Sequence, residues 1–286
     1  MILDGHIHIR GGSEDPGLLA RRFGEAGVEG GSIISLPPSS FRGFGEPLTN
    51  QERLDNLLSW CRAGSHLYPF YWIDPLENDA AEQVDVAVAG GVRGFKVICN
   101  RFPPGHEKAM PVYRSIARAG KPMLFHSGIL WDGAPSSPFN RPAGFEALLE
   151  VDGLRFCLAH ISWPWCDECL AVYGKFLNAF TRRSGLSVEM FIDVTPGTPP
   201  IYRREALTKL YTIGYDVESN VIFGSDSCAN DYGTAWVREW IERDTAILGE
   251  LGVSGESVEL LMSGNLLRFV GEEGSGVRRK APKPGE

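Results

Sequence analysis

The sequence has no long hydrophobic run, no excess of basic residues and few cysteines, and each absence excludes a class of protein. No apolar stretch is long enough to cross a bilayer, and the chain opens without a basic signal-like segment. Asp and Glu total 36 against 28 for Lys and Arg, and the net charge of −8 disfavours nucleic-acid binding. Six scattered cysteines without a secretory signal favour reduced thiols. We therefore expect a cytoplasmic protein whose partner is a small molecule, with no nucleic acid and no membrane.

The chain also lacks the glycine-rich motifs that hold nucleotides. Gly11-Gly12-Ser13 follows the first predicted strand but does not complete G-x-G-x-x-G, and no P-loop is present. Cys166 and Cys169 have the spacing of a metal or redox pair. No second pair accompanies them and they lie in a predicted helix, so a zinc or redox role there is disfavoured.

What the sequence does contain is an alternation of short β-rich segments with segments of helical periodicity. The eight predicted strands are Ile2–Ile9, Gly31–Leu36, Leu67–Ile73, Val92–Cys99, Pro122–His126, Leu154–His160, Ser187–Val194 and Asn220–Ser225. The predicted helices are Pro16–Ala26, Asn50–Ala63, Asp79–Ala89, Glu107–Ala119, Pro142–Glu150, Trp165–Thr181, Ile201–Thr212, Tyr232–Gly249 and Glu256–Val270. Eight strand–helix units in 286 residues predict an α/β protein with a parallel sheet closed into a (β/α)8 TIM barrel. A doubly wound open sheet is the alternative.

We divide the chain into one barrel domain, residues 1–270, with an extra C-terminal helix, and a tail, residues 271–286, that has too little apolar surface to fold alone. Two longer segments, residues 37–49 and 129–141, follow the second and fifth predicted strands. Long loops at the C-terminal ends of barrel strands surround the substrate, so both segments are candidate lids. Surface loops without a function are the alternative for each.

The first predicted strand carries the strongest chemical pattern. Side chains two residues apart lie on the same face of a strand, so Asp4, His6 and His8 share one face. Two imidazoles at this spacing lie close enough to share one metal ion, and neutral imidazole is the commonest metal ligand. The alternative is a pair of hydrogen-bonded core histidines. The Asp4 carboxylate on the same strand face makes this alternative less favoured than a metal site.

Further polar residues fall at the ends of other predicted strands. His126 and His160 end the fifth and sixth strands, and Asp226 follows the eighth. The C-terminal ends of the strands converge in a barrel, so these side chains are expected to meet the histidines of the first strand. Asp226 has an alternative role as the cap of the next helix.

In this arrangement the sequence resembles the metal-dependent amidohydrolase superfamily, in the branch with the aminocarboxymuconate semialdehyde decarboxylase-like proteins and the dicarboxylate lactonases. The motifs that carry the resemblance run in the family's order along nearly the whole chain. They are Asp4-Gly5-His6-Ile7-His8, Met123-Leu124-Phe125-His126, Cys157-Leu158-Ala159-His160, Asp193-Val194-Thr195-Pro196-Gly197, Phe223-Gly224-Ser225-Asp226 and Gly264-Asn265-Leu266-Leu267-Arg268.

The resemblance implies one divalent metal bound by His6, His8, His126 and Asp226. Neutral imidazoles and a carboxylate suit zinc best, with manganese as the alternative. The resemblance also implies that His160 contacts the substrate or, in some members, the metal.

Four residues are candidate substrate contacts. Arg10 directly follows the first strand and can hold a carboxylate, and Trp131 and Trp163 lie in predicted loops beside strand ends. Lys96 lies in the fourth strand, where some superfamily branches carry a carboxylated lysine that bridges two metals. Anion binding and a salt bridge inside the barrel are the other roles open to Lys96. Phe102 and Trp165 are weaker candidates.

The expected chemistry is attack of a metal-activated water on an ester, lactone or amide carbonyl of a small carboxylate-type substrate. Asp226 carries the proton and His160 polarises the carbonyl. The alternative is a metal-dependent non-oxidative decarboxylase of an aromatic or unsaturated acid, because the same groups can manage protons while carbon dioxide leaves. A non-catalytic barrel is a third interpretation. The sequence leaves both a monomer and a homo-oligomer open.

Overall fold

The predicted alternation of strands and helices is confirmed by the computed structural model, which describes residues 1–11, 14–41, 48–183 and 185–272. Within these residues one parallel sheet runs in the order β8-β7-β6-β5-β4-β3-β2-β1-β9. Its strands are β1 (Leu3–His8), β2 (Gly30–Ile34), β3 (Leu67–Trp72), β4 (Gly94–Val97), β5 (Met123–Phe125), β6 (Arg155–Leu158), β7 (Glu189–Asp193), β8 (Val221–Ile222) and β9 (Ser227–Cys228). The order of the first eight strands follows the chain, as a singly wound barrel requires.

The sheet closes on itself. Strand β9 follows β8 after residues 223–226 and pairs in parallel with β1. The Gly5 N–H donates a hydrogen bond of 2.9 Å to the carbonyl oxygen of Phe223, which joins β1 directly to the segment after β8. A Cβ at Gly5 would lie 2.6 Å from the Ile222 side chain, so this close approach requires glycine. Closure excludes the doubly wound open sheet.

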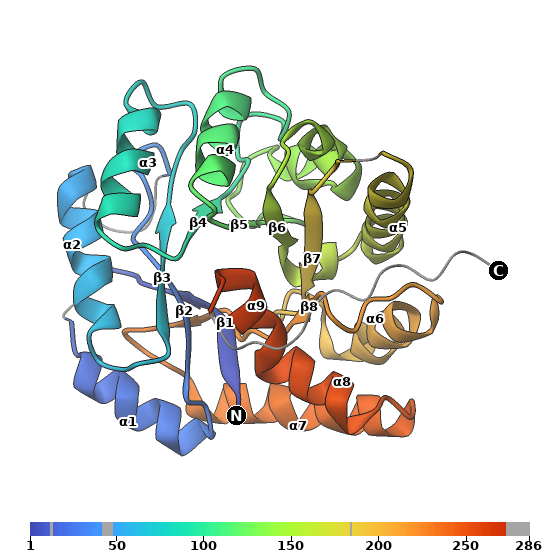
Figure 1. The fold of residues 1–286 in the computed structure, drawn as a ribbon. Helices are drawn as coiled ribbons and strands as arrows, with labels where there is room; N and C mark the ends of the chain where they lie inside the picture. Colours follow the sequence, from blue (N-terminus) through green and yellow to red (C-terminus); the bar gives the residue numbers. More distant parts are fainter. Residues whose placement is uncertain (12–13, 42–47, 184, 273–286) are drawn as a thin grey trace.

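Helices surround the barrel and are coloured from blue to red along the chain in Figure 1. They are α1 (Pro16–Ala26), α2 (Asn50–Cys61), α3 (Ala80–Ala89), α4 (Ala109–Arg118), α5 (Cys166–Arg182), α6 (Pro200–Thr212) and α7 (Thr234–Glu250). Local sequence sets their ends: Thr49 and Glu52 form a capping box at α2, and Gly27 ends α1 in the left-handed conformation. The helix predicted over 142–150 is instead a 3-10 helix, since Pro142 and Gly144 weaken an α-helix of this length.

The C-terminal helix predicted as one piece is interrupted. It consists of α8 (Gly255–Glu259), a π-helical turn (Leu260–Gly264) and α9 (Asn265–Val270). The Asn265 side-chain amide donates to the carbonyl oxygens of Glu218 and Val221, each at 2.7 Å, and so ties α9 to the start of β8. Helix α9 crosses the centre of the barrel in Figure 1 and buries Leu266, Phe269 and Val270 against residues of the barrel interior.

Because α9 closes the N-terminal mouth, the site must open at the C-terminal mouth. No helix of the described residues is long and apolar enough to span a membrane. Most of the tail predicted over 271–286, from residue 273 onward, and residues 42–47 of the first candidate lid lie outside the described residues.

Candidate metal centre and substrate cavity

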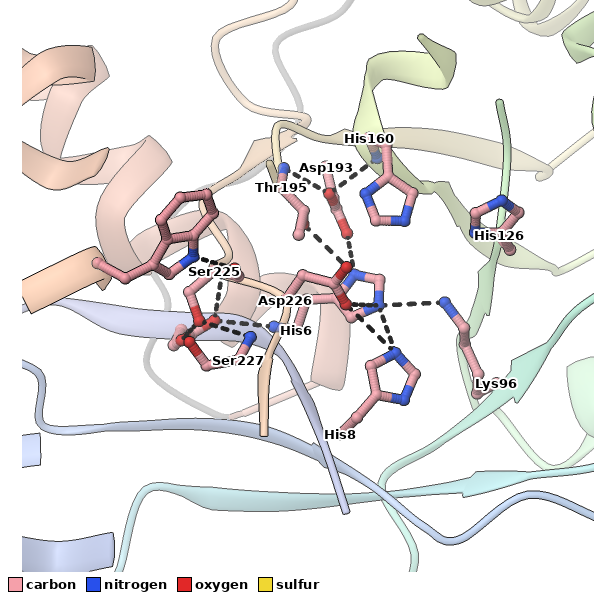
Figure 2. A network of polar contacts seen from close by, with 12 residues as sticks. His6, His8, Lys96, His126, His160, Asp193, Thr195, Ser225, Asp226 and Ser227 are labelled. Atoms are coloured by element: carbon pink, nitrogen blue, oxygen red, sulfur yellow. Dashed lines mark hydrogen bonds and ion pairs between the residues drawn. The ribbon is translucent and has the colours of Figure 1, made fainter. Parts of the chain in front are cut away.

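Strand β1 delivers two imidazoles to the C-terminal mouth, and the segment after β8 delivers a carboxylate. The Nε2 atoms of His6 and His8 lie 3.1 Å apart, and Asp226 Oδ1 lies 3.8 Å from the first and 3.5 Å from the second. The three candidate ligand atoms all lie within 4.8 Å of one another. Figure 2 shows these side chains turned toward one another. Three of the four residues that the resemblance assigned to a metal therefore come together.

Asp226 reaches the site from an unusual backbone conformation. Its φ is 57°, in the left-handed region that a non-glycine residue adopts only when the surroundings hold it there. Its own N–H donates to the carbonyl oxygen of His6 at 3.0 Å. The Asp4 carboxylate holds the preceding residue, accepting bonds from the Ser225 N–H at 2.9 Å and from its hydroxyl at 2.5 Å.

Asp4 shares the strand face of the two histidines but has a structural role. Its carboxylate also accepts from the Tyr232 hydroxyl at 2.8 Å and from the His6 N–H at 3.1 Å. Burial raises the pKa of Asp4 to about 6, against the opposing effect of these hydrogen bonds. The residue therefore ties β1 to the closing segment that carries Asp226.

Asp193, at the end of β7, orients the first histidine. Its Oδ2 lies 2.7 Å from His6 Nδ1, and its Oδ1 accepts from the backbone N–H groups of Thr195 at 2.7 Å and His160 at 3.1 Å. A carboxylate at this distance keeps the proton on Nδ1, so the lone pair of His6 Nε2 faces the site. The Asp193-to-Gly197 motif was visible in the sequence, yet no role for Asp193 was predicted from it.

The other two predicted histidines lie on the β5 and β6 side of the mouth. The His160 ring centroid lies 5.3 Å from that of His6 and 5.0 Å from that of His126. His126 Nε2 lies 3.2 Å from the carbonyl oxygen of Ile129, and His126 is outside the group of three ligand atoms. His160, Ile161 and Ser162 all have positive φ, so a strained turn holds His160 at the rim. A ligand role for His126 stays a prediction.

Lys96 enters the same group from β4. Its Nζ lies 3.2 Å from His6 Nε2, and its side chain is fully buried inside the barrel. Burial lowers the pKa of Lys96 to about 8, while the nearby carboxylates Asp193 and Asp226 act in the opposite direction. Figure 2 shows the lysine reaching toward His6 from a different strand.

Burial controls the charges of the remaining groups. It lowers the pKa of His126 to about 3, and it lowers the pKa values of His6, His8 and His160 well below the ordinary value. The four imidazoles are therefore neutral at neutral pH, the form that ligates metals. Burial also raises the pKa of Asp226 to about 7, opposed by the charge of Lys96. The Asp226 side chain lines the cavity described next and has an exposed fraction of 39%.

The group opens into a cavity of about 480 Å³, within the range typical for a small ligand. The four predicted substrate contacts, Arg10, Lys96, Trp131 and Trp163, all lie on its wall. The rest of the wall is formed by His8, Phe41, Trp72, Ile98, His126, Ser127, Ile129, Leu130, Asp132, His160, Pro196, Gly197 and Asp226. Both candidate lid segments contribute to it, the first through Phe41 and the second through residues 129–132.

Two weaker candidates lie elsewhere. Phe102 is buried beside His106, and Trp165 packs under the guanidinium of Arg141. Cys166 and Cys169 are free thiols on α5. None of these residues lines the cavity.

The donor set fits a divalent metal. Two neutral imidazoles and a carboxylate share one small volume, and Asp193 presents the His6 lone pair in the way that outer carboxylates do at metal sites. Imidazole and carboxylate ligands suit zinc, and manganese as well. The fold and this group together define a (β/α)8 barrel with a candidate metal centre at its C-terminal mouth.

The chain belongs to the amidohydrolase family, whose profile matches residues 19–271. The match begins after β1, so the His6 and His8 pair lies outside the matched residues. No curated protein sequence matches the chain.

Solved structures with the same fold include both hydrolases and decarboxylases. A probable 2-pyrone-4,6-dicarboxylic acid hydrolase from Acinetobacter baumannii, solved with citric acid bound, has 14% identity over 94% of this chain and 99% of that one, with a TM-score of 0.60. A 2,6-dihydroxybenzoate decarboxylase complexed with 2,6-dihydroxybenzoate has 13% identity over 95% and 98%, with a TM-score of 0.64. A dihydroxybenzoic acid decarboxylase from Polaromonas sp. JS666, with bound manganese and 2-nitroresorcinol, has 13% identity over 94% and 96%, with a TM-score of 0.62. At these identities the likeness establishes the fold alone.

Proposed function

We propose that the protein is a metal-dependent hydrolase that acts on an ester, lactone or amide carbonyl of a small substrate bearing a carboxylate. The observation that carries the proposal is that Asp226, one of the three candidate metal ligands, and His160 line the same cavity. His6, His8 and Asp226 would hold the metal, with His126 as a further predicted ligand. A bound divalent cation supplies an activated water at neutral pH and an electrophile for the carbonyl oxygen.

Asp226 is the proposed proton carrier. In the metal-free chain, burial raises the pKa of its carboxyl group to about 7, and a bound cation would lower that pKa by favouring the carboxylate, the form that accepts a proton. Its left-handed backbone and its surface toward the cavity fix the position from which it receives a proton from the attacking water. The same carboxylic acid then returns the proton to the leaving group.

His160 is proposed to bind the carbonyl oxygen. Its Nδ1 is buried without a hydrogen-bond partner. An unpaired N–H there would cost more than a bare nitrogen, so the proton is assigned to Nε2. The ring lines the cavity and burial keeps it neutral by lowering its pKa, so it is suited to donate an N–H to an oxyanion rather than to hold a charge.

The cavity wall suggests the type of substrate. Arg10 and Lys96 supply positive charge, while Phe41, Trp72 and Trp163 supply flat apolar surface. Phe41 packs on Trp72 with ring centroids 4.9 Å apart, and Trp72 and His8 lie edge to face with centroids 5.8 Å apart. A planar, unsaturated ring with a carboxylate substituent matches this combination. The pyrone dicarboxylic acid named for the Acinetobacter protein is a compound of this kind.

Non-oxidative decarboxylation of an aromatic acid is the second candidate. The same cationic and aromatic wall favours it, and two similar structures are named as dihydroxybenzoate decarboxylases. Asp226 would then donate a proton to the ring carbon as carbon dioxide leaves.

One experiment separates the two candidates. Metal-free protein is loaded with zinc or with manganese and incubated with planar lactones, esters, amides and aromatic acids, while acid release and carbon dioxide are measured in parallel. Hydrolysis predicts acid release without carbon dioxide, and it predicts loss of turnover in Asp226→Asn samples that still contain metal. Carbon dioxide as the product would replace the first candidate by the second. Full activity of the Asp226→Asn variant would contradict the assigned proton carrier.

A further inference from the structure

We infer that the Lys96 ammonium group occupies the candidate metal centre in the metal-free protein, and that a divalent metal must displace it in order to bind. The inference rests on the proposed metal site but not on the reaction performed there. It assigns to Lys96 a role in controlling metal affinity, distinct from that of a ligand.

The lysine contacts the imidazole nitrogen that a metal would use. Lys96 Nζ lies 3.2 Å from His6 Nε2, one of the three candidate ligand atoms. Because Asp193 Oδ2 holds the proton on His6 Nδ1 at 2.7 Å, Nε2 carries the lone pair and accepts the hydrogen bond from the ammonium group. The lysine therefore uses the electron pair that a metal needs.

The ammonium group is also buried. Lys96 lies within β4, pairs with Trp72 and Leu124 on the neighbouring strands, and has no exposed surface. A charge in this position requires partners, and the His6 lone pair together with the negative charges of Asp193 and Asp226 provides them. These are the groups that the proposed metal centre also uses.

The two cations cannot share the site. An imidazole nitrogen binds zinc at about 2.0–2.1 Å, so an ion on His6 Nε2 would overlap or crowd an ammonium group on the same lone pair. Like charges at such separations repel strongly in a buried environment. The bound metal must therefore push the Lys96 ammonium off His6.

The cavity is the space that we propose the displaced ammonium enters, because the buried Lys96 borders it. There its charge meets whatever anion the cavity holds. A carboxylate ligand then stabilises the displaced lysine, so metal and carboxylate each raise the affinity for the other. The metal centre and the anion site are thereby coupled through one side chain.

The test measures zinc affinity, not turnover. Metal-free wild type, Lys96→Met and Lys96→Arg are titrated with zinc against a chromophoric chelator, with and without benzoate as the carboxylate probe. Lys96→Met is expected to bind zinc roughly ten- to hundredfold more tightly than wild type, the range for one charge-assisted hydrogen bond. Lys96→Arg keeps the charge and is expected to stay as weak as wild type. Benzoate is expected to tighten zinc binding in wild type but not in Lys96→Met.

Each other outcome decides against the inference. Equal zinc affinity in wild type and Lys96→Met overturns it and leaves the metal centre standing. Weaker binding in Lys96→Met, with wild-type affinity that rises on adding bicarbonate, makes Lys96 a carboxylated ligand instead. Absence of zinc binding in both proteins overturns this inference and metal-dependent function together.

A second measurement uses only the wild-type protein, so it tests the inference even where Lys96→Met does not fold. Crystal structures of wild type without and with zinc are expected to show Lys96 Nζ bonded to His6 Nε2 in the first and moved into the cavity in the second. An ammonium group that keeps its bond to His6 in the zinc-loaded crystal would also overturn the inference.

Discussion

Asp193→Asn tests how the protein prepares its histidine for a metal. The carboxylate accepts three hydrogen bonds, from His6 Nδ1 and from the backbone of Thr195 and His160. In the variant, the asparagine oxygen can keep both backbone bonds, which leaves its NH2 group facing His6 Nδ1. Two donors then face each other, and His6 avoids this by moving its proton to Nε2. The lone pair that a metal needs is lost from the site.

The size of the effect follows from burial. His6 has an exposed fraction of 0% and Asp193 of 2%, so no water replaces the lost acceptor. Loss of an outer carboxylate costs about 10- to 100-fold in metal affinity, or about 1.4–2.7 kcal/mol. Loss of one charge-assisted hydrogen bond, about 1.5–3 kcal/mol, gives the same range independently.

The assay is zinc titration of the metal-free variant against a chromophoric chelator, with circular dichroism to establish that it is folded. Asp74→Asn is the matched control, since Asp74 is 4% exposed, lies two residues after the end of β3 and accepts a 2.9 Å bond from the Leu76 N–H. The control is expected to bind zinc like wild type. Wild-type affinity in a folded Asp193→Asn variant would refute the argument that Asp193 sets the His6 tautomer.

Three further predictions concern stability and the cavity. Phe269→Ala removes a 2%-exposed ring from α9 and is expected to lower the free energy of unfolding, measured in urea titrations, by about 3–5 kcal/mol. A loss below about 1 kcal/mol would show that the packing of α9 against the barrel contributes little to stability. In metal-free protein, burial lowers the pKa of His126 to about 3. Between about pH 6.5 and pH 3 this imidazole therefore binds a proton in the unfolded chain but not in the folded one, and the free energy of unfolding decreases as the pH falls. His126→Asn is therefore expected to reduce the slope of unfolding free energy against pH by about 1.4 kcal/mol per pH unit, and an unchanged slope would contradict the neutral buried imidazole. Trp131→Ala, at a side chain 81% exposed on the cavity rim, is expected to change stability by less than about 0.5 kcal/mol while raising KM on the substrate found; unchanged KM would remove Trp131 from the substrate contacts.

The architecture could be predicted from the sequence because it depends on local periodicity. Alternation of strands and helices, with β1 opening the chain and Asp226 following β8, is enough to specify a closed parallel barrel and to bring His6, His8 and Asp226 to one mouth. The interrupted C-terminal helix could not be predicted in this way, because its π-helical turn makes a contact that is distant in sequence: the Leu261 carbonyl oxygen accepts a 3.1 Å bond from the Phe223 N–H.

The finer arrangement of the site depends on contacts between distant strands. The bond from Lys96 to His6 spans 90 positions, and the pairing of Asp193 with His6 spans 187. No spacing rule predicts which rotamers meet inside a closed barrel. The same limit applies to Phe102 and Trp165, which are candidate substrate contacts by sequence but do not line the cavity, since a ring beside a strand end packs equally well between loops.

The proposed metal centre places one divalent metal between β1 and the segment after β8. Anomalous diffraction from zinc-soaked crystals, recorded on both sides of the zinc absorption edge, tests this placement. We expect a single strong peak within bonding distance of His6 Nε2, His8 Nε2 and the carboxylate of Asp226. Soaked crystals in which this position holds no anomalous peak would contradict it.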